Sequence, residues 1–314
     1  MSRSRRLVDP ELAPMLEMPP LDLQPETLAD VRAHPMFTGA DLPPPLCPVR
    51  EVFVAAEHGP EVRLLVIDPP SSAASRPAIL YIHGGGMVAG RADSTLDDKP
   101  KLALEHGCVV VSVDYRLAPE TPFPGPQEDS YAALLWLVAN AEELGVDPSR
   151  VIVMGASAGG GLAASLALML RDRGGPQLAG QVLIYPMLDW RTGSDACPYR
   201  NRHTGEFIWT REKNQFGWEA LRGNYRPDDH RKGWFSPVLA EDLSNLPPAY
   251  IATGALDLFL DEDLAYARRL IDEGIPTEVH VYPGAIHGFE AVPGTRLAGQ
   301  AAADLDRALR RLLA

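Results

Sequence analysis

Short, continuous apolar stretches alternate along the chain with longer segments of mixed polarity. The stretches rich in β-branched residues lie at 78–82, 108–113, 151–154, 182–185 and 249–252. Runs of this length and composition are typical of strands buried on both faces of a parallel sheet. Amphipathic spacing or a clear start signal predicts helices at about 127–143, 158–173, 261–273 and 296–313. The alternation of the two patterns predicts an open α/β sheet flanked by helices.

A hairpin is predicted ahead of these strands. Residues 50–56 and 61–67 show the alternating polarity of a half-exposed edge and flank the turn sequence His58-Gly59-Pro60. Two alternating runs around such a turn are typical of antiparallel pairing. We therefore expect the sheet to begin with antiparallel strands.

Two segments lack the alternating pattern of strands and helices. Residues 1–49 contain many prolines, which exclude one long helix and favour short helices joined by extended turns. Residues 189–245 lose the apolar runs and are rich in Trp, Arg, His, Gly and Asn. We expect these two segments to form a helical cap over an α/β core made of residues 50–188 and 246–314.

The charge and composition of the chain limit the kinds of molecule that it is expected to bind. The 314 residues are 46% hydrophobic and 23% charged, which is ordinary for a globular protein, and the formal net charge is -13. Nucleic acids and anionic membranes are bound mainly through Lys and Arg, so an acidic chain argues against both. No run approaches the roughly 20 apolar residues of a membrane span.

The compartment is predicted from the cysteines and the first residues. Cys47, Cys108 and Cys197 are few, odd in number and widely spaced, which favours a reducing compartment over a disulfide framework. The basic start is not followed by the apolar stretch of a secretory signal. We therefore expect a cytoplasmic protein.

A candidate nucleophile stands where a strand meets a helix. The apolar run at 151–154 leads into Gly155-Ala156-Ser157-Ala158-Gly159, which fits the pattern G-x-S-x-G. Small residues on both sides of Ser157 allow a sharp turn that holds a serine hydroxyl out of the sheet. Strain at a polar apex is typical of a reactive site, so Ser157 is the expected nucleophile.

An oxyanion hole is predicted from a glycine-rich loop. His83-Gly84-Gly85-Gly86 follows the strand at 78–82, and glycines let backbone amides point inward. The amide of Ala158, at the start of the next helix, adds another donor. We expect Gly85, Gly86 and Ala158 to stabilise an oxyanion.

The same glycines also fit the dinucleotide-binding pattern G-x-G-x-x-A, at 84–89 and again at 159–164. That fingerprint requires a helix that opens directly at the glycines and an acidic residue about 20 positions on. Asp114 lies at a suitable distance, but 90–94 does not read as a helix start, and the second match lies inside a helix. We therefore expect no nucleotide and no other cofactor.

Asp257 is the candidate acid, because it lies in the loop after the strand at 249–252. After a nucleophile on such a strand-to-helix turn, the acid and base are expected to follow in chain order, at the C-terminal ends of later strands. Asp261, Glu262 and Asp263 are the rivals. They open a helix, where carboxylates commonly cap amides and complement the dipole.

His287 is the candidate base. It lies in the loop after the last predicted strand, 278–282, and the near-neutral pKa typical of histidine suits a group that takes and returns a proton. His83 and His280 fit structural roles better. The remaining histidines show no pairing at the spacing of metal ligands, so we expect no metal.

Five groups of residues occur in one characteristic order: His83 to Gly86; Asp114 to Glu120 with Phe123-Pro124; Gly155 to Gly160; Asp257 with Asp261-Glu262; and His287 to Phe289. With these motifs the chain resembles the hormone-sensitive-lipase family of α/β-hydrolase esterases, in its bacterial branch. The resemblance implies a mostly parallel eight-stranded sheet with a helical cap and the hydrolysis of short- to medium-chain acyl esters. Ala156 and Leu258 depart from the family, where Asp and Pro are common.

The expected reaction is ester hydrolysis through an acyl-enzyme on Ser157, with a small-molecule ester as substrate. Two alternatives remain open: a non-catalytic small-molecule receptor on the same fold, and an amidase or carbamate hydrolase with the same triad. A homodimer through a sheet edge or the C-terminal helix is also expected. The residues expected to line the substrate pocket are Met87, Val88, Leu188, Trp209, Leu258 and Phe289, although cap aromatics such as Trp209 equally fit packing of the cap onto the sheet.

Overall fold

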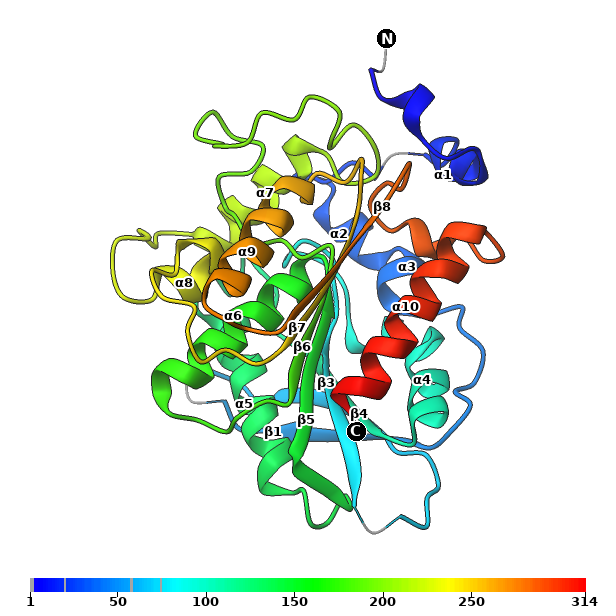
Figure 1. The fold of residues 1–314 in the computed structure, drawn as a ribbon, viewed down its shortest axis with the longest axis vertical. Helices are drawn as coiled ribbons and strands as arrows, with labels where there is room; N and C mark the ends of the chain where they lie inside the picture. Colours follow the sequence, from blue (N-terminus) through cyan, green and yellow to red (C-terminus); the bar gives the residue numbers. More distant parts are fainter. Residues whose placement is uncertain (1–2, 20, 57–58, 74) are drawn as a thin grey trace.

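An eight-stranded sheet runs through the computed structural model, which describes residues 3–19, 21–56, 59–73 and 75–314 (Figure 1). The strand order is β1-β2-β4-β3-β5-β6-β7-β8. Their bounds are β1 Val49–Val54, β2 Val62–Ile67, β3 Arg76–Ile82, β4 Val109–Asp114, β5 Val146–Ala156, β6 Gly180–Ile184, β7 Ala249–Gly254 and β8 Thr277–Tyr282.

Strand direction follows the sequence-based expectation. β1 pairs antiparallel with β2, and β2 pairs antiparallel with β4, whereas the remaining neighbours are parallel. The prediction of a mostly parallel α/β-hydrolase sheet that begins antiparallel is therefore confirmed. His58, in the predicted hairpin turn, lies outside the described residues.

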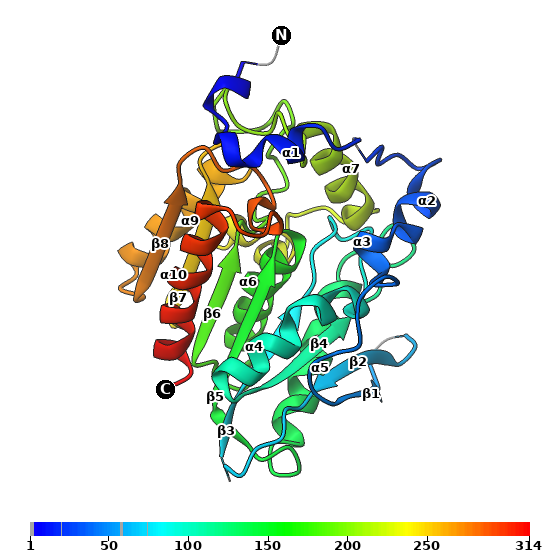
Figure 2. The ribbon, with the colours of Figure 1, turned by 90° about the vertical axis from the view of Figure 1, so that its right-hand side faces the viewer.

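Helices cover both faces of the sheet (Figures 1 and 2). α4 and α10 lie on one face, and α5 and α6 lie on the other. Apolar side chains of α9 join the same buried cluster as those of α6. The bounds are α4 Lys99–His106, α5 Gly125–Ala139, α6 Ala158–Arg173, α9 Leu260–Asp272 and α10 Arg296–Leu312.

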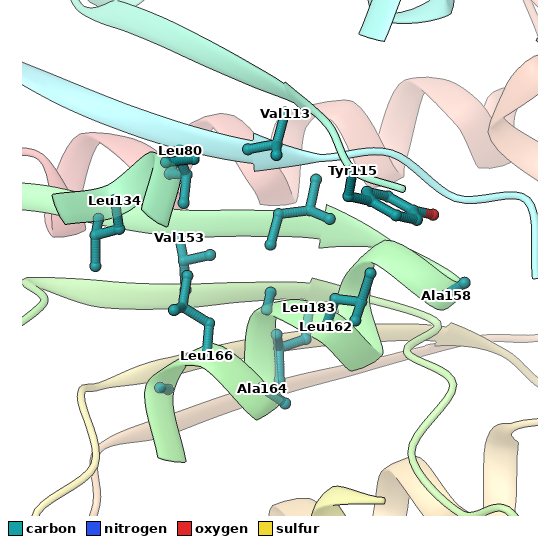
Figure 3. Packing of buried hydrophobic residues seen from close by; sticks show 14 of the residues in the cluster. Leu80, Val113, Tyr115, Leu134, Val153, Ala158, Leu162, Ala164, Leu166 and Leu183 are labelled. Atoms are coloured by element: carbon teal, nitrogen blue, oxygen red, sulfur yellow. The ribbon is translucent and has the colours of Figure 1, made fainter. Parts of the chain in front are cut away.

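The core consists of two apolar clusters, one on each side of the sheet. Alternate residues of β3 contribute to opposite clusters, because successive side chains of a strand point to opposite faces. Leu80 belongs to the cluster that packs against Leu162 and Leu166 of α6, as Figure 3 shows. Ile79 belongs to the cluster on the other face. This packing fixes α6, and with it Ser157, against the central strands.

The two segments expected to form a cap consist of short helices and loops. Both contribute side chains to one cavity that also contains Ser157. The division into cap and core stays a prediction. The N-terminal elements are η1 Arg5–Leu7, η2 Pro10–Leu12, α1 Ala13–Leu16, α2 Leu28–Ala33 and α3 Pro35–Thr38; those of the insertion are α7 Arg211–Arg222, α8 Lys232–Phe235 and η4 Pro237–Leu239.

Two short helical elements stand between a strand and the helix that follows it. They are η3 Ala92–Asp97, before α4, and η5 Phe289–Ala291, before α10. Across the described residues, no helix combines the length and apolar composition that crossing a membrane requires.

Candidate active site

Ser157 occupies the turn between β5 and α6 with φ 56° and ψ -122°. Such a backbone conformation is uncommon and strained for a residue with a side chain. The turn depends on its glycines: a Cβ on Gly155 would lie 2.2 Å from the oxygen of Gly159, and a Cβ on Gly159 would lie 2.0 Å from the oxygen of Ile82. The amide of Ser157 donates to the Ile184 carbonyl at 2.9 Å, which ties the turn to β6.

Ser157, His287 and Asp257 form a continuous hydrogen-bonded chain. The Oγ of Ser157 lies 3.1 Å from Nε2 of His287, and Nδ1 of His287 lies 2.8 Å from Oδ2 of Asp257. All three residues are buried. The structure thus brings together three predicted residues that are up to 130 positions apart in the sequence.

The end of β7 places Asp257. Its amide donates to the carbonyl of Gly254 at 3.1 Å, and its Oδ1 accepts the amide of Phe259 at 2.9 Å. One carboxylate oxygen therefore holds the loop, while the other faces His287. A carboxylate fixed in this way selects the tautomer with a proton on Nδ1.

The rival acids make other contacts. Glu262 accepts the amides of Leu188 and Asp189 at 2.6 and 3.1 Å, and also the hydroxyl of Thr192. Burial, together with the charge of Asp189, raises the pKa of Glu262 well above its usual value. This carboxyl group thus fixes the loop after β6.

Asp263 is fully buried beside Glu262. Neither of its carboxyl oxygens has a hydrogen-bond partner among the described residues. Burial, with the charges of Glu262 and Asp257, raises its pKa well above the usual range for an aspartate. Burial therefore favours the neutral form of this carboxyl group over the charged form.

The loop after β3 carries free amide donors. The amides of Gly85, Gly86 and Ala158 make no hydrogen bond to another residue within the described part of the chain. Gly85 has φ 109°, and a Cβ there would lie 2.1 Å from the carbonyl oxygen of Ala89. Only glycine fits this position without displacing the loop.

Tyr115 supports the same loop from below. Its hydroxyl donates to the carbonyl of His83 at 3.1 Å, and its ring stacks on the His83 ring with a centroid distance of 4.2 Å. The amide of Ala118 donates to the Met87 carbonyl at 2.9 Å. His83 is thus engaged in the support of the loop, as its position before the glycines suggested.

Ser157 and His287 open into a cavity of about 470 Å³, a volume typical of small-molecule sites. Apolar side chains of the N-terminal segment form one part of its wall, residues of the insertion form a second part, and residues at the ends of strands or in the loops after them form the rest. The lining residues are Met15, Met18, Leu21, Leu23, Val31, Met36, Phe37, Gly84, Gly85, Ala89, Ala156, Ser157, Tyr185, Ile208, Trp209, Lys213, His287, Gly288, Glu290, Ala291 and Val292.

The structure places only one of the residues expected in the pocket wall at the cavity. Trp209 does line the cavity, but the other expected residues pack into the two buried clusters instead. Proximity in sequence to a catalytic position does not determine where a side chain points, and in these tight loops the flanking side chains turn into the core. The residues that do not line the cavity are Met87, Val88, Leu188, Leu258 and Phe289.

Polar residues of the cavity were missed by the sequence reasoning. The hydroxyl of Tyr185 donates to Oε1 of Glu290, and Nζ of Lys213 donates to the Ile208 carbonyl at 2.7 Å. Glu290 lies three positions after His287, so its place in the sequence was a usable signal. Nothing in the local pattern marks Tyr185 or Lys213. Within the described residues, no group of three His, Cys, Asp or Glu side chains is arranged to hold a metal ion.

Similarity to known proteins shows the family to which this chain belongs. A model of the family described as having the alpha/beta hydrolase fold matches residues 79–291. The chain belongs to this family, and its bacterial carboxylesterase relatives place it in the branch resembling hormone-sensitive lipase.

Individual relatives are similar to this chain over 77% to 98% of its length. The carboxylesterase NlhH of Mycobacterium tuberculosis is 36% identical over 321 residues, which cover 96% of this chain and 97% of that protein. The ethyl acetate hydrolase of Pseudomonas putida is 37% identical over 246 residues, or 77% of this chain and 75% of that protein. The solved structure of a bacterial heroin esterase has a TM-score of 0.90 and 38% identity, covering 98% of this chain and 99% of the other.

Proposed function

We propose that this protein is a serine carboxylesterase that hydrolyses short- to medium-chain acyl esters. The observation that carries the proposal is the hydrogen-bonded chain from Ser157 through His287 to Asp257 at the wall of a mostly apolar cavity. Relatives named as esterases along nearly the full chain support the same activity.

The proposed first step forms an acyl-enzyme. His287 removes the proton of the Ser157 hydroxyl through Nε2, and Oγ attacks the ester carbonyl. The amides of Gly85, Gly86 and Ala158 donate to the oxyanion of the tetrahedral intermediate. As the intermediate collapses, the bond to the alcohol oxygen breaks and the imidazolium of His287 gives its proton to the departing alcohol.

The second step releases the acid. A water molecule gives a proton to His287 and attacks the acyl carbonyl, and the same amides hold the second oxyanion. Collapse returns the proton to Oγ of Ser157 and frees the carboxylic acid. Asp257 keeps its charge throughout and stabilises the imidazolium.

A series of p-nitrophenyl esters from acetyl to decanoyl tests the activity and the chain-length preference. We expect turnover to be highest for the shorter members, because the cavity volume of about 470 Å³ limits the acyl chain. The Ser157→Ala protein should be inactive across the series. Absence of turnover in the unaltered protein would favour a receptor, and faster cleavage of matched anilides than of esters would favour an amidase.

Assembly and location are part of the proposal. The outer edge of β8 has no partner strand within the described sheet, and an exposed edge can pair with a second copy. A homodimer predicts twice the chain mass in analytical ultracentrifugation, whereas a single-chain mass at all concentrations would contradict it. The three free cysteines support a reducing, cytoplasmic location, which fractionation of the source cells would check.

A further inference from the structure

Glu290 places a carboxyl group in a cavity wall that is otherwise mostly apolar. Among the described residues that line the cavity, it alone has an acidic side chain. Its Oε1 accepts the hydroxyl of Tyr185, and its Oε2 makes no hydrogen bond to another described residue. One carboxylate oxygen is therefore available to a molecule that enters the cavity.

Glu290 forms no ion pair with another described residue. The positive charge that acts on it from nearby is that of Lys99, at the start of α4, but Nζ of Lys99 lies 2.6 Å from the carboxylate of Asp98 and 4.2 Å above the centre of the Tyr81 ring. Lys213, the cation in the cavity wall, donates to a backbone carbonyl. Because Lys99 is already paired, the charge of Glu290 is free to attract a ligand.

Glu290 is positioned to lie beside the alcohol part of an ester bound at Ser157. The ring of Tyr185, which holds the carboxyl group, packs against His287 with a centroid distance of 4.6 Å. A base that returns its proton to the leaving oxygen must lie beside that oxygen. The leaving alcohol and Glu290 therefore lie on the same side of Ser157.

We propose that Glu290 is a specificity-determining residue that favours esters whose alcohol part carries a cationic amine or quaternary ammonium group. This inference rests on the proposed esterase function. A cation beside the carboxylate gains Coulomb energy that is larger in a partly desolvated cavity than in water. The rings of Tyr185 and Trp209 in the same wall offer faces that attract cations.

The preference depends on pH in a defined direction. Although the side chain is accessible from the cavity, the surrounding protein desolvates the carboxyl group and raises the pKa of Glu290 to about 7. Attraction to a cation is therefore present above this pH and is lost as the pH falls through it. The titratable and charged groups around the carboxyl and in the same cavity are Tyr81, Asp98, Lys99, Tyr185, Lys213 and His287.

A matched pair of substrates isolates the effect of a positive charge on the alcohol part of the ester. Butyrylcholine and 3,3-dimethylbutyl butyrate share size and shape, but a carbon atom replaces the ammonium nitrogen in the second. The ratio of their kcat/KM values cancels the pH dependence of the hydrolytic steps that both reactions share. In the unaltered protein we expect this ratio to rise with pH through about 7.

Three variants test the assignment. Glu290→Gln should lower the ratio roughly tenfold and make it independent of pH, because the amide keeps the shape and loses the charge. Lys213→Met removes a charge from the same cavity and should not lower the ratio. Glu273→Gln, an exposed position after α9, should leave the ratio unchanged.

The outcomes separate the two proposals. A lower, pH-independent ratio in Glu290→Gln alone supports the inference. An unchanged ratio, with hydrolysis of the neutral ester still far above that of Ser157→Ala, overturns the inference and leaves the esterase function standing. Hydrolysis of neither ester by the unaltered protein, or equal hydrolysis by Ser157→Ala, overturns the proposed function itself.

Discussion

At Ser157 the backbone rather than the side chain sets the position of the hydroxyl group. The strained turn leaves the side chain with His287 as its hydrogen-bond partner, and His287 is in turn fixed by Asp257. Each of these three side chains depends on the other two for its proposed role in catalysis. Catalytic effects of residues that act as such a unit are not additive.

Asp257→Asn tests the orientation of His287. The amide has the size of the carboxylate but favours the wrong tautomer of the imidazole, so kcat should fall by about 10⁴-fold. Asp261→Asn, four residues on in the first turn of α9, is the matched control and should stay within a few-fold of the unaltered protein. Steady-state kinetics on p-nitrophenyl butyrate measures both. Equal losses would mean that the acid has been misassigned.

Gly85→Ala tests the oxyanion loop. A Cβ would lie 2.1 Å from the Ala89 carbonyl oxygen, so the loop must shift and move its amides. We expect kcat to fall roughly 100- to 1,000-fold, the loss typical of one oxyanion donor. Gly107→Ala shares a positive φ but meets nothing within 4 Å, so it should lower stability slightly without a fall in kcat. Unchanged kcat in Gly85→Ala would exclude this loop from the oxyanion site.

Among the secondary-structure elements, α2 of the N-terminal segment is joined by one arginine to the loop after β3, which carries Gly85 and Gly86. Arg32 of α2 donates through Nε to the Val88 carbonyl at 2.7 Å and through Nη2 to the Ala118 carbonyl at 2.9 Å. The same guanidinium pairs with Glu120. Arg32 thus connects the N-terminal part of the cavity wall to the loop after β3.

Arg32→Met should loosen that connection. Two backbone carbonyls lose a charged donor, which should lower the free energy of unfolding by about 2 kcal/mol and raise KM more than it lowers kcat. Limited proteolysis should then cut the N-terminal segment sooner. Arg50→Met, which removes an exposed pair with Glu143, should change neither property. Identical proteolysis of the two variants would contradict a bracing role for Arg32.

Elements differed in how well the sequence predicted them. The central strands were recognised because both faces are buried and their apolar runs are unbroken. α4 was missed because it buries Lys99 and Pro100 beside Ala103, which gives no amphipathic pattern. α7 was missed because two of its four buried positions are Asn214 and Gly217, so apolar residues do not mark its buried face.

The residues of the candidate site also differ in how well the sequence predicts them. Ser157, Asp257 and His287 were predicted as the triad because each follows a strand in the order that this fold requires, and the structure places them within hydrogen-bonding distance of one another. The cavity wall could not be derived in this way, since it joins side chains from the two ends of the chain, such as Val31 and Val292. No spacing rule relates residues that meet only through tertiary packing.

At the scale of the whole molecule, buried acids make stability depend on pH. The pKa of Asp263 is raised well above its unfolded value of about 3.9, so the folded protein binds this proton more tightly than the unfolded chain does. The stabilisation is complete below the unfolded pKa and is lost as the pH rises toward the folded pKa. Asp263 therefore costs stability at neutral pH.

Asp263→Asn removes this dependence. The difference in Tm between variant and unaltered protein should shift in favour of the variant as the pH rises from about 4.5 to about 7.5. Thermal unfolding at a series of pH values measures this difference directly. Asp41→Asn, at an exposed loop position, should give a difference that does not vary with pH. A constant difference for Asp263→Asn would show that the buried carboxyl group titrates normally.

A reaction that passes through a covalent bond to Ser157 makes this residue the target of diethyl p-nitrophenyl phosphate. Attack by Oγ on phosphorus releases p-nitrophenolate and leaves a stable diethylphosphoryl serine. We predict release of about one equivalent per active chain, loss of esterase activity in parallel, and peptide mass spectrometry that places the label on Ser157. A label on another residue, or full labelling with activity retained, would exclude Ser157 as the nucleophile.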